Sequence, residues 1–179
     1  DLPAMMAEKD KLVSELTGGI EFLFKKNKVE WLKGQAVFTG KDSVQVGDRT
    51  VRAKNIVIAT GSSVTPLPGV TIDQKVVVDS TGALMLPKVP KHLVVIGGGV
   101  IGSEFASVYT DFGVNTTLLE ALPHGVLPVG PDRDTANVLA RALAKRGTAI
   151  HAEARVGTVE ATSNGLVVPF ETPKGADKI

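Results

Sequence analysis

The stretch LVVIGGGVIGSEFASVYTDFGVNTTLLE, from Leu93 to Glu120, decides the fold that we predict for this chain. It opens with Leu93–Ile96, an apolar and mostly β-branched run of the kind that forms buried parallel strands. Three glycines then follow in the pattern G-x-G-x-x-G, and apolar residues at helical spacing come next. Gly113 ends this predicted helix, and a second apolar segment ends on an acid. This order is typical of a dinucleotide-binding βαβ unit.

Each glycine of the pattern has a separate physical task in such a unit. Gly97 allows the tight turn out of the strand, Gly99 lets the backbone approach a pyrophosphate, and Gly102 lets the helix pack closely on the strand. The helix N-terminus supplies free N–H groups and the positive end of the helix dipole. A glycine-rich turn without a ligand is the structural alternative, but the complete context of strand, helix and acid favours nucleotide binding.

The acid at the end of the second predicted strand indicates which nucleotide binds. Glu120 stands where a carboxylate accepts hydrogen bonds from the adenosine ribose hydroxyls and repels a 2′-phosphate. The three residues after it, Ala121, Leu122 and Pro123, offer no cation for a phosphate. We therefore expect NAD rather than NADP.

Composition limits the classes of function. The 179 residues are 43% hydrophobic, enough for one or two domains with a packed core. The net charge of +1 gives no reason to expect nucleic acid or an anionic membrane as a partner. With no bilayer-length apolar run, we expect a soluble, intracellular protein. There is no cysteine, which excludes disulfides and thiol redox chemistry within this chain, and the three histidines show no metal-ligand spacing. We expect no metal site.

The flanking residues predict further elements. Residues 1–26 read as an amphipathic helix, followed by short β-type segments from Val29–Leu32 to residue 53 that form an antiparallel meander, and by a strand at 55–61. The helix's expected core-facing stripe consists of Met5, Leu12, Leu16 and Ile20. Later elements are a proline-containing linker at 62–68, a strand at Val76–Val78, a short helix capped by Ser80, a helix from Asp132 or Asp134 to Gly147, a third parallel strand at 149–152, and a hairpin around Asn164-Gly165.

Two motifs together suggest a family. The sequence IVIATGS at Ile56–Ser62, then a proline-containing linker, then VVIGGGVIG at Val94–Gly102, resembles the flavin disulfide reductases, and within them the dihydrolipoyl dehydrogenases most closely. Segments 16–29 and 80–91 are also similar to that family, so the resemblance covers essentially the whole chain.

The resemblance implies FAD and NAD as cofactors. For FAD, the turn would lie beside the flavin nucleotide, and the backbone of Ala36 would approach its adenosine part. The residues of that turn are Ala59, Thr60, Gly61 and Ser62. An ordinary strand-end turn is the alternative for this motif.

For NAD, the resemblance assigns the pyrophosphate to the glycine-rich turn, the ribose to Glu120 and a backbone contact to Val156. Ile101 would lie near the contact between flavin and nicotinamide. Glu104 resembles a family glutamate near both rings, but an acid in the first turn of a helix is also favoured by the dipole alone. The residues of the turn are Gly97, Gly98, Gly99, Val100, Ile101 and Gly102.

The chain departs from the family pattern at several points. It lacks the family's first G-x-G-x-x-G, its redox-active cysteine pair, its interface domain and the strand that closes the NAD sheet beside Leu93–Ile96. We therefore interpret it as a middle segment with an α/β fold. Residues 1–68 would be the C-terminal part of the first FAD-binding segment, with its small β-meander. Residues 69–179 would be a Rossmann-like NAD-binding domain with a parallel sheet that lacks its last strand.

A complete chain of this kind would oxidise dihydrolipoamide with NAD⁺. The substrate would be carried on the acyltransferase core of a 2-oxoacid dehydrogenase complex, and the enzyme would be a homodimer in the bacterial cytoplasm or mitochondrial matrix. Without thiols, we expect this segment alone to be inactive. The alternatives are another flavin disulfide reductase and a non-catalytic NAD-binding module.

Overall fold

A computed structural model describes residues 1–163 and 165–179. The chain divides between Ser63 and Val64 into two units, and each is described here by itself. The assignment of residues 1–68 to an FAD-related part and 69–179 to an NAD-binding part stays a prediction. The predicted turn residue Asn164 lies outside the described residues.

The first unit begins with helix α1, Leu2–Lys26, where the sequence predicts a helix. The Asp1 carboxylate caps it by accepting a hydrogen bond from the N–H of Ala4 at 3.2 Å. No residue of α1 is buried, and Leu16 is 71% exposed. The expectation that its apolar stripe faces a core is therefore wrong for the described residues. Helical spacing determines which side chains share a face, but it does not determine what covers that face.

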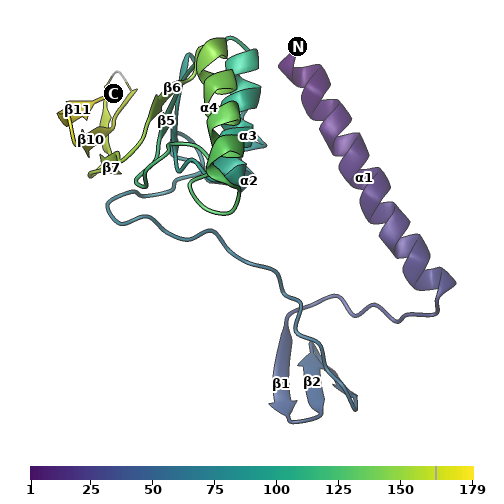
Figure 1. The fold of residues 1–179 in the computed structure, drawn as a ribbon. Helices are drawn as coiled ribbons and strands as arrows, with labels where there is room; N and C mark the ends of the chain where they lie inside the picture. Colours follow the sequence, from purple (N-terminus) through teal and green to yellow (C-terminus); the bar gives the residue numbers. More distant parts are fainter. Residues whose placement is uncertain (164) are drawn as a thin grey trace. The chain divides into compact units, whose positions relative to one another are not determined.

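A small antiparallel sheet follows α1 in the same unit, with strand order β1-β2-β3 (Figure 1). Its strands are β1 Ala36–Gly40, β2 Ser43–Val46 and β3 Arg49–Arg52. The predicted meander is confirmed.

Two other predicted strands of this unit are absent from the structure. At Val29–Leu32 the chain leaves α1 through Lys28, whose φ of 55° is left-handed, and the Trp31 ring packs edge-on against Phe24 with 5.8 Å between centroids. At residues 55–61 no described strand pairs with the chain, and Val57 is 86% exposed. A β-type sequence forms a strand only where a neighbouring strand accepts its ladder.

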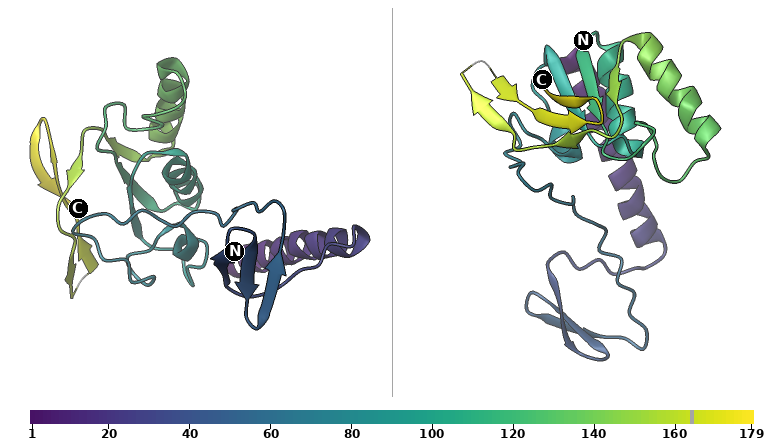
Figure 2. Two further views of the ribbon diagram at one scale, coloured as in Figure 1. Left: turned by 90° about the horizontal axis from the view of Figure 1, so that it is seen from below. Right: turned by 60° about the vertical axis from the view of Figure 1, so that its left-hand side comes forward.

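The second unit is built on a parallel sheet of strand order β4-β5-β6 (Figure 1). The strands are β4 His92–Ile96, β5 Asn115–Leu119 and β6 Ala149–His151. The connecting helices are α3 Val100–Asp111 and α4 Arg133–Arg146, which lie on one face of the sheet, as the two views of Figure 2 also show. Strand, glycine-rich turn, helix and strand thus follow in the predicted order, and the α/β fold is confirmed.

The two faces of the parallel sheet have separate cores. Successive side chains of a strand point to opposite faces, so Leu118 and Leu119, both almost fully buried, face different partners. Leu118 lies toward the glycine-rich turn. Leu119 belongs to a cluster on the other face with Ala154, Val168 and Phe170.

That second cluster is covered by antiparallel strands in the order β11-β10-β7 (Figure 1). These are β7 Arg155–Val156, β10 Pro169–Thr172 and β11 Gly175–Lys178, and a separate hairpin is formed by β8 Glu160–Thr162 and β9 Gly165–Val167. The predicted pairing of the segments around residues 156 and 170 is present, with Val156 opposite Phe170.

Two predictions for the part of the second unit that precedes β4 are wrong. Val76–Val78 is no strand: the Asp73 carboxylate accepts hydrogen bonds from the N–H groups of Lys75, Val76 and Val77 at 2.8–2.9 Å, which holds the segment in a turn. The short helix α2, Ser80–Ala83, is capped by Asp79 rather than Ser80. A carboxylate is an equally good cap and stands one residue earlier. No helix among the described residues is long and apolar enough to cross a membrane.

Candidate nucleotide-binding site

The candidate site lies at the carboxyl ends of β4 and β5, the edge at which open parallel sheets bind ligands. The turn from β4 into α3 carries the glycine pattern, and Glu120 directly follows β5. The register pairs Ile96 with Leu119, so the turn and the acid emerge from the sheet side by side. The backbone supports this, since the N–H of Gly97 donates to the carbonyl of Leu119 at 2.8 Å.

The glycines at 97, 98 and 102 are required by the fold itself. Gly97 has a φ of 107°, in the region that favours glycine. A Cβ on Gly102 would overlap the Gly97 carbonyl and lie 3.2 Å from the side chain of Val95, so the close helix-to-strand packing expected of Gly102 is present. A Cβ on Gly98 would overlap the carbonyl of Gly125.

Gly99 differs from the other three glycines. It is the N-cap of α3, with a φ of −64° and a ψ of −174° that any residue adopts, and a Cβ there would meet no described atom within 4 Å. Neither backbone conformation nor lack of space therefore requires glycine at this position, although glycine is one of the residues favoured at a helix N-cap. The N–H groups in the first turn of an α-helix have no partner within the helix. In α3 no side chain caps them either. An exposed helix N-terminus with an unobstructed backbone fits a pyrophosphate.

Glu120 is brought to the glycine-rich turn, as predicted. It is only 8% exposed, and its two carboxylate oxygens accept hydrogen bonds from the N–H groups of Gly98 and Leu122, both at 2.7 Å. Its own N–H donates to the carbonyl of His151 at 2.9 Å. A carboxylate has about four acceptor positions, so two remain for ribose hydroxyls. The acid is thus held in a fixed orientation next to the turn.

Ser103 was missed by the sequence-based prediction. It is 4% exposed, and its hydroxyl donates to the carbonyl of Gly98 at 3.0 Å. The N–H of Leu127, from the loop after β5, donates to the same carbonyl at 2.7 Å. A serine in the first turn of a helix carries no signal that distinguishes this contact from exposure to solvent.

The other residues predicted to contact NAD lie either in α3 or on the opposite face of the sheet. Val100 and Ile101 are exposed in the first turn of α3, at 61% and 57%, and Glu104 is exposed one turn later. The side chain of Val156 packs instead against the Leu119 cluster on the other face of the sheet. The contacts expected between these residues and NAD stay predictions.

The predicted FAD residues are not assembled into a site. Ala36 lies on β1 opposite Val46. The turn residues belong to an exposed segment without helix or strand; they are Ala59, Thr60, Gly61 and Ser62. All five residues are exposed, so within the described part of this unit they do not by themselves enclose a flavin nucleotide. Likewise, no group of three or more acidic or histidine side chains among the described residues is placed to hold a metal ion.

The parallel sheet, the glycine-rich turn into α3 and the acid after β5 define a dinucleotide-binding α/β protein of the Rossmann class. Residues 2–177 match the family model described as pyridine nucleotide-disulphide oxidoreductase. The chain belongs to this family.

Known proteins and structures show which members of the family the chain is similar to. The chain is 47% identical over 180 residues to dihydrolipoyl dehydrogenase 3 of Pseudomonas putida, covering 98% of this chain and 38% of that protein. It is 48% identical over 181 residues to the mitochondrial dihydrolipoyl dehydrogenase of Dictyostelium discoideum, covering 98% and 37%. The crystal structure of LpdA from Mycobacterium tuberculosis matches 99% of this chain and 40% of its own chain with a TM-score of 0.83 and 26% identity.

These comparisons confirm the resemblance to the flavin disulfide reductases, an oxidoreductase family whose cofactors are FAD and NAD(H). The chain spans less than two-fifths of the length of the curated relatives it matches, at 38% and 37%.

Proposed function

We propose that this chain supplies the NAD-binding part, and a portion of the FAD-binding part, of a flavoprotein dihydrolipoyl dehydrogenase. In the whole enzyme, dihydrolipoamide would be oxidised with NAD⁺. One observation supports the NAD assignment: three features meet at one edge of the sheet. They are the free space beside Gly99, the N-terminus of α3 without a side-chain cap, and the Glu120 carboxylate held by the N–H of Gly98.

Each residue has a defined task in this proposal. The N–H groups of the first turn of α3 bind the pyrophosphate, and Gly99 allows its close approach. Glu120 accepts hydrogen bonds from the ribose hydroxyls and disfavours the 2′-phosphate of NADP. Ile101 and Glu104 would help to hold the nicotinamide, a group whose chemistry is hydride transfer. The chain has no cysteine, so its share of the reaction is nucleotide binding and orientation rather than thiol exchange.

The wider assignments rest on the relatives. We place Val156 near NAD, and Ala36 and the turn at 59–62 near FAD, as in the family pattern. The complete protein would act as a homodimer on dihydrolipoamide bound to the acyltransferase core of a 2-oxoacid dehydrogenase complex. Relatives occur in a bacterium and in mitochondria, which favours the cytoplasm or the matrix.

A titration of the purified chain with NADH, followed by nucleotide fluorescence, tests the proposal directly. NADPH is the matched control, since it differs only by the 2′-phosphate. We expect saturable binding that favours NADH by roughly tenfold or more, which corresponds to about 1.4 kcal/mol of discrimination. Equal affinity for the two nucleotides, or no saturable binding by a chain whose circular dichroism shows that it is folded, would contradict the proposal.

A further inference from the structure

We propose that Ser103 and Glu120 are positioning residues that hold the Gly98 backbone from both sides and thereby aim the N–H of Gly99 at the bound pyrophosphate. We call this arrangement the Gly98 clamp; it consists of the Ser103 hydroxyl, the Glu120 carboxylate and the Leu127 N–H. The inference rests on the proposed NAD binding and extends it to a residue, Ser103, that no glycine pattern contains.

The clamp saturates the polar groups of Gly98. Its N–H donates to Glu120 at 2.7 Å, and its carbonyl accepts from the Ser103 hydroxyl at 3.0 Å and from the Leu127 N–H at 2.7 Å. One donor and two acceptor lone pairs are all that a backbone residue offers. Gly98 is buried, so water does not compete for these bonds.

Planarity of the peptide bond transmits the effect of the clamp to the ligand side. The carbonyl of Gly98 and the N–H of Gly99 belong to one trans peptide, so they point in opposite directions. Two donors hold the carbonyl toward the protein interior. The N–H of Gly99 is therefore directed away from it, on a residue whose Cβ position is unobstructed. A glycine peptide without such bonds rotates readily, because glycine populates both signs of φ.

The contact of Ser103 is not ordinary helix back-bonding. A serine within a helix usually bonds to the carbonyl three or four residues earlier. Here the carbonyl four residues earlier, that of Gly99, accepts from the N–H of Ser103 itself at 2.9 Å. The hydroxyl reaches one residue further, past the helix N-cap, to the turn that is to be positioned.

The loop after β5 is shaped around the same carbonyl. Leu127, which donates to Gly98, has a φ of 46°, and Gly125, whose carbonyl packs against Gly98, has a φ of 66°. A left-handed leucine costs roughly 1–2 kcal/mol and persists only where its surroundings fix it. The clamp thus joins the glycine-rich turn, the acid and this loop into one unit.

The test compares Ser103→Ala with Ser107→Ala in the full chain. Ser107 is a matched control, since it lies one turn later on α3 and its hydroxyl also has a partner, Arg146 at 2.8 Å. We expect Ser103→Ala to raise the NADH Kd by roughly three- to tenfold, the effect of one lost hydrogen bond, and Ser107→Ala to leave it unchanged. Ser103→Thr keeps the hydroxyl and is expected to bind like the parent chain.

Two further readouts separate positioning from general stability. Tm values show whether the serine variants lose comparable stability, and the NMR shift of the Gly99 amide on NADH addition reports the aimed N–H directly. We expect that shift in the parent chain and in Ser107→Ala, and a reduced shift in Ser103→Ala. Parent-like NADH affinity and Gly99 shift in Ser103→Ala, or an equal loss in Ser103→Thr, would overturn the clamp while leaving the proposed function intact. No NADH binding by the folded parent chain would overturn both.

Discussion

At the scale of single residues, the glycine-rich turn shows how one motif combines structural and functional requirements. Gly98 and Gly102 have no space for a Cβ, and Gly97 needs its positive φ. Only Gly99 has both an ordinary conformation and free space around it. The structural reading of the motif, a turn without a ligand, therefore explains three glycines but not the fourth. Close approach of a pyrophosphate to the Gly99 backbone, as proposed above, would account for glycine at this position.

This distinction predicts opposite results for neighbouring substitutions. Gly99→Val is expected to cost about 1 kcal/mol or less of stability, because the position has free space but valine is a poorer N-cap than glycine, and to weaken NADH binding by more than roughly tenfold through steric block. Gly98→Ala is expected to lower the free energy of unfolding by about 1–3 kcal/mol through overpacking. Thermal melts and NADH titrations of both variants check this. Unaltered NADH affinity in Gly99→Val would remove Gly99 from the site.

Glu120 has both a structural role and a proposed role in nucleotide binding. Its removal leaves the N–H groups of Gly98 and Leu122 without their partner, so Glu120→Ala is expected to cost about 1–3 kcal/mol of stability. It is also expected to weaken NADH binding and to reduce the preference for NADH over NADPH, because the carboxylate no longer repels the 2′-phosphate. The measurement is the ratio of the two Kd values in the variant and the parent chain.

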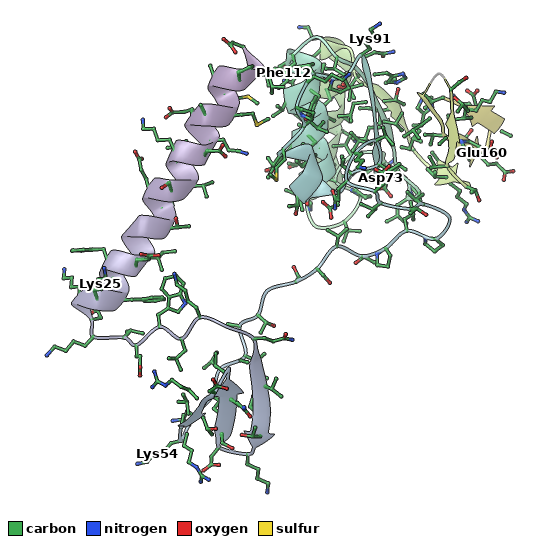
Figure 3. The ribbon with its side chains drawn as sticks, turned by 180° about the vertical axis from the view of Figure 1, so that it is seen from behind. Lys25, Lys54, Asp73, Lys91, Phe112 and Glu160 are labelled. Carbon is green, nitrogen blue, oxygen red and sulfur yellow. The ribbon has the colours of Figure 1, made fainter. Side chains whose placement is uncertain are left out.

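The control for this prediction is Glu160→Ala, which removes an exposed acid from β8 (Figure 3). It changes the net charge equally and is expected to leave the ratio unchanged. A preference for NADH that survives in Glu120→Ala would show that another residue selects the nucleotide.

At the scale of elements, α4 shows how a local signal sets both a boundary and a pH dependence. The Asp132 carboxylate caps α4 by accepting from the N–H of Thr135 at 2.9 Å and from its hydroxyl at 3.0 Å. These bonds hold the pKa of Asp132 below its ordinary value of 3.8. A folded-state pKa below the unfolded value means that the cap stabilises the protein above the unfolded pKa, and that this contribution is lost as pH falls through the folded pKa.

The corresponding prediction concerns Asp132→Ala. The variant is expected to melt below the parent chain at pH 6, and the difference is expected to shrink as pH falls below about 4, near the unfolded pKa of an aspartate. Melting curves from pH 3 to 6 measure it. Asp134→Ala, which removes an acid from the same turn but not the capping bonds, should show a smaller difference at pH 6. A constant gap for Asp132→Ala across this range would argue against an ionised cap.

How much of the fold was predictable depended on whether the deciding signal was local. Asp132 and Gly147, the latter with a φ of 111°, mark the ends of α4 by their own chemistry, and the apolar run of β4 and the spacing of α3 are equally local. Residues 55–61 have strand-forming composition but no paired strand in the described chain, so composition alone predicted a strand that the structure lacks.

The candidate site likewise contains some residues that sequence spacing predicts and others that only the folded structure reveals. Spacing was enough to select the glycines and Glu120, because the βαβ unit places strand ends together at fixed separations. Ser103 and the Leu127 N–H could not be found from spacing. Their role depends on where the loop after β5 meets the turn, which is a property of the folded chain.

At the scale of the whole molecule, the two units differ in how complete they are as folded bodies. The second unit contains all but one of the buried hydrophobic and polar residues of the described chain, whereas the first has a single buried residue, Ser43. Every hydrogen bond of the Gly98 clamp and of Glu120 also joins residues of the second unit. The buried core and the candidate site are therefore both formed within the second unit.

We accordingly predict that a fragment of residues 64–179 binds NADH with the affinity of the full chain, and that a fragment of residues 1–63 does not bind it. The core of the second unit, on both faces of the parallel sheet, comes from its own strands and helices, so the fragment is expected to unfold cooperatively. Thermal melts establish folding, and NADH titrations of both fragments and the full chain then compare affinities. A cooperatively folded 64–179 fragment with a roughly tenfold weaker Kd would mean that residues 1–63 contribute about 1.4 kcal/mol to binding, and the nucleotide site would have to be redrawn to include them.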